Sequence, residues 1–254
     1  MVERNGLITR FDGPHPVGLS GQTHVPALPP SRRGAVESVN VGVPRTLDLR
    51  GEQVTTSIWK SPVAGRVRVE GVNIVGDDQA DRTVHGGVDK AVYAYGVEDY
   101  DWWAQELAHE MEPGTFGENL TVRGLPVSGA VVGERWHIGS VLLEVSQPRQ
   151  PCYKLGIRMN DARFPRRFTV AGRPGAYLRI VEEGELAAGD SIEVVHRPEH
   201  GLTVGEVAYI FVKARHQARR LLDAPELPPS WREWAHSQVT RHATPSRTRG
   251  QSAT

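Results

Sequence analysis

Cys152, the only cysteine of the chain, lies in the segment Gln-Pro-Arg-Gln-Pro-Cys-Tyr-Lys-Leu at residues 147–155. Pro148 and Pro151 each fix their own backbone angle φ and bias the preceding residue away from the helical region. A segment stiffened in this way holds its side chains in place at little further cost in entropy. The sulfur is therefore a candidate for chemistry that needs a fixed position.

Two cations, Arg149 and Lys154, lie within a few residues of the sulfur. If residues 153–158 form a short helix, Cys152 also lies at its positive end. These features favour the thiolate, which is the form that acts as a nucleophile and as a metal ligand. The alternative is that Cys152 is a small buried hydrophobe, as single free cysteines often are. This segment alone does not decide between the two.

Paired glycines follow His85, at Gly86 and Gly87, between an acidic loop and an apolar run. Such a pair lets the backbone approach a ligand closely and can present amide groups to an anion. The alternative is an ordinary tight turn with a structural histidine.

A second polar segment, Phe-Gly-Glu-Asn-Leu at residues 116–120, contains Asn119. An asparagine amide can offer both a donor and an acceptor to a heterocycle. It can equally cap its own backbone in a turn, so this segment is not specific when taken alone.

The composition excludes several classes of protein. The 254 residues contain 30 Lys and Arg and 30 Asp and Glu, so no net charge attracts the chain to nucleic acid or to an anionic membrane. One cysteine excludes an internal disulfide and a four-cysteine zinc site, and it suits a reducing compartment. We find no signal peptide and no apolar run near the roughly 20 residues of a membrane span. The expected location is the cytoplasm.

Hydrophobic patterning predicts a mainly β fold with a few helices. Residues 1–37 are rich in proline and glycine without apolar periodicity, and we expect a flexible leader. Residues 38–197 contain short alternating runs such as residues 65–71, together with a helix at residues 98–111. Turns that combine glycine with an acidic residue are typical of barrel corners, so we expect this body to be a β-barrel.

The pattern changes after residue 198. Thr203 and Glu206 form a capping box at the start of an apolar helical face. Residues 202–237 therefore predict a small α-helical domain, and residues 238–254 predict a polar, basic tail that frays.

The motifs become specific when they are taken together. Their order is an acidic loop, Val-His-Gly-Gly-Val-Asp-Lys at residues 84–90, Phe-Gly-Glu-Asn-Leu, Val-Gly-Glu at residues 132–134, and the segment around Cys152. This order resembles the MOSC family, which is named for the C-terminal domain of molybdenum cofactor sulfurases. It is most similar to the stand-alone bacterial YiiM-type members, which carry a three-helix domain after the barrel. The resemblance covers about residues 38–236.

The resemblance implies a MOSC-type β-barrel that binds molybdenum cofactor (Mo-molybdopterin). Cys152 would ligate molybdenum, and a soft thiolate suits a thiophilic metal. Arg149 and Lys154 would neutralise the pterin phosphate or the anionic metal–sulfur core. The other residues implied to line the cofactor pocket are His85, Gly86, Gly87, Lys90 and Asn119.

The resemblance also implies a reaction, the reduction of N-hydroxylated compounds such as hydroxylaminopurines, hydroxylamines and amidoximes by N–O cleavage at molybdenum. His85 and Asp78 are the candidates to assist departure of the oxygen. Two other functions stay open. Cys152 could carry a persulfide as a sulfur transferase, or the chain could be a non-catalytic carrier of the cofactor.

A reductase of this kind needs electrons from elsewhere. The sequence has no spare cysteine for an iron–sulfur cluster and no Rossmann glycine fingerprint, so we expect a separate flavoprotein or similar donor. Arg215, Arg219 and Arg220 in the helical domain are one possible docking surface, and the alternative is a solvated helix face.

Overall fold

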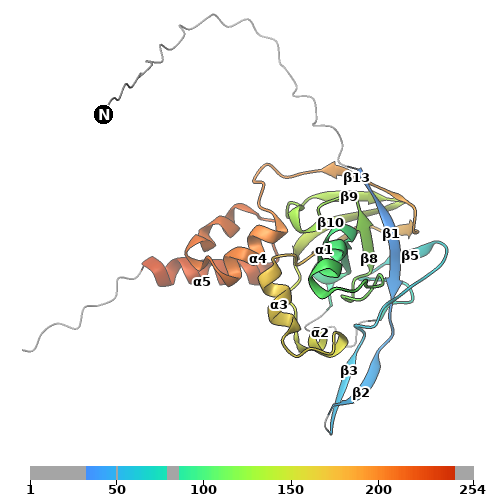
Figure 1. The fold of residues 1–254 in the computed structure, drawn as a ribbon. Coiled ribbons are helices and arrows are strands. Elements are labelled where there is room, and N and C mark those ends of the chain that lie inside the picture. Colours follow the sequence, from blue (N-terminus) through green and yellow to red (C-terminus); the bar gives the residue numbers. More distant parts are fainter. Residues whose placement is uncertain (1–32, 50, 79–85, 244–254) are drawn as a thin grey trace, which may run out of the picture. The chain divides into compact units, whose positions relative to one another are not determined.

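The computed structural model describes residues 33–49, 51–78 and 86–243 (Figure 1). The strands are β1 Arg33–Val41, β2 Arg45–Leu49, β3 Glu52–Thr56, β4 Ser61–Pro62, β5 Val67–Glu70, β6 Asn73–Ile74, β7 Val92–Gly96, β8 Leu120–Arg123, β9 Arg135–Ile138, β10 Val141–Pro148, β11 Ala176–Glu182, β12 Gly184–Leu186 and β13 Ser191–His196. The helices are α1 Val97–Leu107, α2 Tyr153–Arg158, α3 Phe164–Ala171, α4 Val204–Val212 and α5 Pro229–Ala243, with 3₁₀ segments η1 Val88–Lys90, η2 Val127–Gly129 and η3 Arg215–Asp223.

The main sheet closes on itself. Its strands follow the order β13, β9, β10, β11, β7, β8, β1, and β1 pairs in turn with β13. The β7–β8 pair is parallel, and the other pairs of this ring are antiparallel. The predicted mainly β barrel followed by helices is therefore confirmed.

Strand β7 is buried on both faces, and β11 is buried or half-buried where it pairs with β7, at residues 176–178. The alternation of their side chains sorts these residues into two cores. Val92 and Ala94 on β7 point into the barrel core. Tyr93 and Tyr95, which alternate with these two residues along the strand, belong to a second core of aromatic side chains. Tyr177 on β11 packs against this second core. Because successive side chains of a strand point to opposite faces, the tyrosines face outward from the barrel.

The aromatic core is covered by α1, α2 and α3. Trp103 from α1 and Phe164 and Phe168 from α3 are at most 1% exposed, and Leu155 anchors the short helix α2 in the same cluster. The segment that contains Cys152 is therefore held at one end by the barrel strand β10. At the other end it is held by helix α2, which the buried Leu155 fixes against the aromatic core.

The C-terminal helices share the barrel's core. Val207 and Ile210 of α4 and Trp231 of α5 belong to the same cluster of buried side chains as the barrel strands. The Trp231 indole N–H donates to the Gln147 side-chain oxygen at 2.7 Å. As predicted, Thr203 caps α4, and its hydroxyl accepts a hydrogen bond from the Glu206 amide at 3.1 Å.

The structure differs from the sequence expectations at both ends of the described chain. Strand β1 begins at Arg33, inside the segment expected to be a leader, because Val36 and Val39 are both buried, on either side of an irregularity in the pairing of β1 with β8. Helix α5 runs to Ala243, into the expected tail, and Gln238 is only 6% exposed. The β2–β3 hairpin and α3 were not expected. None of the described helices is long and apolar enough to cross a membrane.

Candidate functional site

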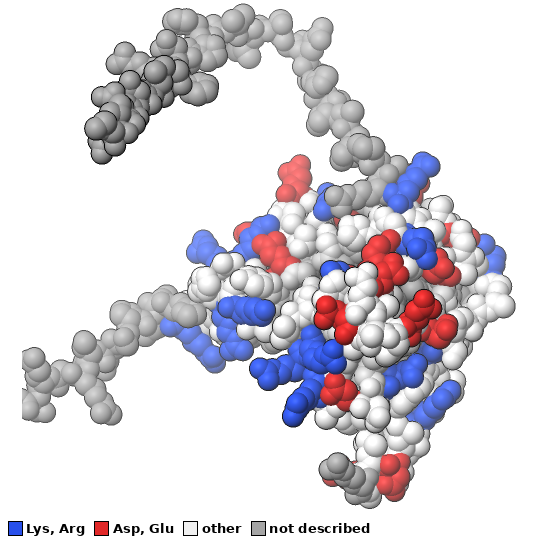
Figure 2. Space-filling model, viewed as in Figure 1, with Lys and Arg blue, Asp and Glu red and all other residues white. Residues whose placement is uncertain are grey.

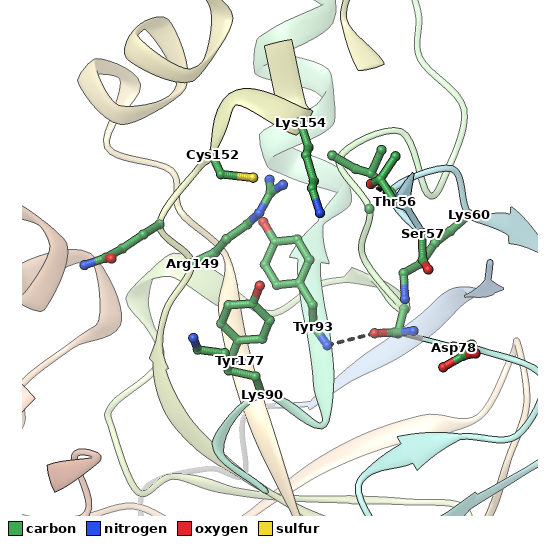
Figure 3. A pocket seen from close by; sticks show the side chains of 14 residues that line it. Thr56, Ser57, Lys60, Asp78, Lys90, Tyr93, Arg149, Cys152, Lys154 and Tyr177 are labelled. Carbon is green, nitrogen blue, oxygen red and sulfur yellow. Dashed lines mark hydrogen bonds between the residues drawn. The ribbon is translucent and has the colours of Figure 1, made fainter. Parts of the chain in front are cut away.

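A cavity of about 100 Å³ lies where the Cys152 loop meets the outer face of β7 and β11 (Figure 3). Its walls come from the end of β3 and the turn after it, from η1, β7 and β11, from the turn before β8, and from the loop after β10 together with α2. The lining residues are Thr56, Ser57, Ile58, Lys60, Asp78, Lys90, Tyr93, Gly117, Asn119, Arg149, Gln150, Cys152, Lys154 and Tyr177.

Cys152 lies at one side of this cavity, as the residue preceding the first turn of α2. Figure 3 shows its sulfur and the Arg149 guanidinium pointing toward one another, with the Lys154 side chain reaching into the same cavity. The thiol is partly exposed, so it is not enclosed in the hydrophobic interior. The interpretation of Cys152 as an inert core residue is therefore unsupported by its surroundings.

Arg149 is the most unusual cation of the site because it is 8% exposed and has no ion pair with a described carboxylate closer than 4.0 Å. Its guanidinium lies 5.2 Å from the ring centroid of Tyr93 and 5.5 Å from that of Phe168. Among the described residues, its Nη1 atom has no hydrogen-bond partner. A buried donor without a partner costs free energy, so this atom is suited to an anion in the cavity.

Lys60 lies in the opposite wall from Cys152 and is held by a buried carboxylate (Figure 3). Its ammonium donates to Asp77 Oδ2 at 2.5 Å, and the same oxygen accepts from the Asn119 amide at 2.9 Å. The other Asp77 oxygen accepts from the Gly42 backbone amide at 2.8 Å. Burial lowers the pKa of Lys60, and the neighbouring Asp77 opposes that effect. Asp77 thus positions both Lys60 and Asn119.

Asn119 uses its side chain to organise the cavity floor. Its oxygen accepts from the Tyr93 backbone amide at 3.1 Å, and its nitrogen also donates to the Asn40 carbonyl at 3.3 Å. Asn119 does line the cavity. Its side-chain oxygen and nitrogen, however, already form hydrogen bonds with protein groups.

Glu118, beside Asn119, has no exposed surface. Its Oε1 atom accepts hydrogen bonds from the Tyr100 hydroxyl at 2.7 Å, the Gly114 amide at 2.6 Å and the Thr121 hydroxyl at 2.8 Å. Its Oε2 atom has no partner among the described residues. Burial raises the pKa of Glu118, although these three hydrogen bonds oppose the shift.

The structure brings together most of the residues predicted from the sequence. Those that line the cavity are Cys152, Arg149, Lys154, Lys90, Asn119 and Asp78. Gly86 and Gly87 are described but are not part of this lining. His85 lies outside the described residues, so its predicted roles are not addressed by the structure.

Sequence reasoning missed Lys60, Tyr93 and Tyr177. Lys60 gave no signal, because its partner Asp77 is far along the chain. The tyrosines gave a weak signal, because each stands between apolar residues of a strand: Tyr93 in the fully buried β7, and Tyr177 between the buried Ala176 and Leu178 of β11. Burial raises the pKa of Tyr177, so its hydroxyl stays protonated and can donate.

The donor set of the cavity fits a sulfur-bound anionic group. Lys60, Lys90, Arg149 and Lys154 supply positive charge, Asp78 is the acidic residue of the lining, and Cys152 offers a soft ligand. The volume is below the roughly 300 Å³ at which ligand pockets usually begin. A cavity of this size has room for part of a drug-sized ligand and not for a whole one.

Comparisons with known proteins place the chain in a family. A family model described as MOSC domain matches residues 81–193. The uncharacterized protein YflK of Bacillus subtilis (strain 168) is 36% identical over 203 residues, which cover 79% of this chain and 92% of YflK. The crystal structure of YiiM from Geobacillus stearothermophilus matches with a TM-score of 0.67 and 30% identity, over 81% of this chain and 99% of that one.

A longer relative carries a functional name. A protein called "Reductase" from Gibberella moniliformis (strain M3125 / FGSC 7600) is 31% identical over 211 residues. The match covers 81% of this chain but only 37% of that protein. The motif order, the closed barrel with its C-terminal helices and these matches lead to one conclusion: the chain belongs to the MOSC domain family, as a YiiM-type protein.

Proposed function

We propose that this chain binds molybdenum cofactor through Cys152 and reduces N-hydroxylated compounds by cleaving the N–O bond. The observation that carries the proposal is the Cys152 sulfur facing a buried Arg149 whose Nη1 atom lacks a hydrogen-bond partner among the described residues. A site with a soft ligand beside a desolvated cation favours a group that is both thiophilic and anionic. The family match and the relative named "Reductase" support the same direction.

The residues of the cavity divide the work of holding the cofactor. Cys152 would supply the ligand to molybdenum, while Arg149 and Lys154 would neutralise anionic oxygen or sulfur beside it. Lys60, held by Asp77, would bind a second anionic group at the opposite wall. When bound, the cofactor supplies the two-electron redox chemistry. The balance is R–NHOH plus two electrons and two protons to R–NH2 plus water.

Protons for the leaving oxygen must come from groups of the chain or from water. Lys60 is the best placed described candidate, because it is a cation in the cavity wall whose pKa burial lowers. Asp78 also lines the cavity and stays a candidate. The same holds for His85 on sequence grounds.

The test compares native protein with the Cys152→Ser variant. Molybdenum and pterin content should fall at least about tenfold in Cys152→Ser, since a hydroxyl is a poor substitute for a thiolate ligand. Wild-type protein with dithionite-reduced methyl viologen should convert 6-hydroxylaminopurine to adenine. Unchanged thermal unfolding would show that the variant is folded.

The outcomes separate the alternatives. Equal molybdenum in both proteins would rule out Cys152 as the ligand. Cyanide-labile sulfur on Cys152 without metal would favour the sulfur carrier, and bound cofactor without turnover of any N-hydroxylated substrate would favour the cofactor carrier.

A further inference from the structure

A second, larger hollow of about 500 Å³ lies between α3 and α4. One wall is formed by residues 148–151, directly before Cys152. Arg149 and Gln150 line both this groove and the Cys152 cavity. The groove and the cavity are therefore separated by a single stretch of loop.

The centre of the groove is apolar and open to solvent. Val170 of α3 is 60% exposed, and Tyr209 and Val212 of α4 are 54% and 44% exposed. Phe211 and Trp231 line the groove beneath them. Exposed apolar side chains that cluster in a hollow mark a site of interaction, whereas scattered ones need no explanation.

The charged residues of the groove are all cations, namely Arg149, Arg173 and Lys213. Arg173 is paired with Asp99, whereas Lys213 is exposed at the end of α4. Figure 2 shows further Lys and Arg side chains gathered over α3, where Arg166 and Arg167 are exposed. Arg167 has one acidic neighbour, Asp161, at 3.6 Å. An apolar centre with a rim of one charge is typical of a protein interface.

We infer that this groove docks an acidic electron-donor protein, which delivers electrons past Pro151 to the cofactor at Cys152. The inference rests on the proposed function, because N–O cleavage consumes two electrons and this sequence has neither cysteines for a cluster nor a dinucleotide fingerprint. A one-electron donor docks twice per turnover. Redox partners form small, transient interfaces, and an interface over this groove suits that class.

The surface expected from the sequence is less suitable. Arg220 of η3 is bound by Glu206 at 3.4 Å, by Asp223 at 3.1 Å and by the His200 carbonyl. Its charge is therefore largely engaged within the domain. Arg219 is exposed on the same segment and does not line the groove, which makes it a matched control.

The experiment drives the holo-protein with two kinds of donor. One is dithionite-reduced methyl viologen, a small cation that needs no docking surface. The other is an acidic protein, either flavodoxin kept reduced by its NADPH-dependent reductase or a [2Fe–2S] ferredoxin. The variants are Lys213→Glu, Val170→Glu and the control Arg219→Glu, and each reverses or adds charge at an exposed position, so the fold should be kept.

Lys213→Glu and Val170→Glu should each slow protein-driven reduction of 6-hydroxylaminopurine by about tenfold at low salt, and 0.5 M NaCl should slow the wild type similarly. Viologen-driven turnover and the KM for the substrate should not change. Arg219→Glu should behave as wild type with both donors.

Each other result has a distinct meaning. Absence of viologen-driven turnover in the wild type would contradict the proposed function itself. Viologen-driven turnover without any flavodoxin- or ferredoxin-driven turnover would overturn the docking inference alone, as would groove variants that match Arg219→Glu. A changed substrate KM with viologen would assign the groove to the small-molecule substrate instead.

Discussion

At the scale of single residues, the Glu118 carboxyl group differs from a glutamate in water in both its burial and its protonation. The carboxyl group is fully buried, and its three hydrogen bonds converge on one oxygen while the other has no partner among the described residues. A neutral acid is compatible with this arrangement because the proton can remain on Oε2. The site therefore contains a buried acid beside its cations, and the sequence gives no sign of it.

This residue makes the stability of the fold depend on pH. Because burial raises the pKa of Glu118 above 4.5, the folded protein binds more protons than the unfolded chain between 4.5 and the folded pKa. The free energy of unfolding should therefore fall as pH rises through that window, by at most about 1.4 kcal/mol per pH unit. Urea unfolding of wild type and Glu118→Gln from pH 4.5 to 8 measures the effect.

Because Glu118→Gln keeps all other titrating groups, it is the control for their contribution to the pH dependence of stability. The difference in free energy of unfolding, wild type minus Glu118→Gln, should decrease with rising pH. A difference that is constant, or that increases, would mean that Glu118 ionises at or below its ordinary pKa.

At the scale of elements, the turn that contains Gly114 constrains the position of the segment that carries Lys60. Gly114 has a backbone φ of +85°, and a Cβ atom there would lie 2.7 Å from the Lys60 carbonyl oxygen. Its amide also donates to Glu118. The turn before β8 thus packs directly on the segment that carries Lys60, and a side chain at this position has no room.

Gly114→Ala should therefore destabilise the protein by about 2–4 kcal/mol, since backbone strain and a steric clash add. Gly65→Ala is the matched control, because Gly65 has φ of +80° but nothing within 4 Å of the added Cβ. It should cost only about 1 kcal/mol. Equal losses of free energy of unfolding would show that the contact with Lys60 has no energetic weight.

The elements also show what the sequence can and cannot predict. Helix α2 runs from Tyr153 to Arg158, so the condition under which Cys152 lies at the start of a short helix is met. Of the residues assigned to the cofactor pocket, Cys152, Arg149, Lys154, Lys90 and Asn119 do meet in one cavity, whereas Gly86 and Gly87 do not line it and His85 lies outside the described residues. Lys60 could not be predicted, because its position depends on a pairing with Asp77 across folded space.

At the scale of the whole described chain, the barrel and the C-terminal helices belong to one compact unit. They share a core, a β-bridge between Val131 and Thr203, and the hydrogen bond between Trp231 and Gln147. Gln147 belongs to the segment that leads to Cys152. The helices therefore support the site as well as covering the barrel.

Native-state hydrogen exchange should reveal this coupling. Amides of α4 and of β10 should open with free energies that agree within about 1 kcal/mol, because neither can unfold without exposing the shared core. The β2–β3 hairpin, whose strands contribute no side chain to either core, should open at lower free energy. Mass spectrometry of deuterium uptake in low urea measures both. Earlier opening of α4 than of β10 would contradict a single cooperative unit.

The closure of the barrel limits how other molecules can join it. Since β1 pairs with β8 and also with β13, the strands of the ring have hydrogen-bonded neighbours on both sides. A foreign peptide therefore has little exposed amide ladder in the ring to extend, and fibril-like stacking is discouraged in the same way. The β2–β3 hairpin forms a separate two-stranded sheet. The three-stranded sheet β12–β5–β6 also lies outside the ring and has open edges. Strand addition to this protein, natural or engineered, should accordingly occur at these two small sheets and not at the barrel.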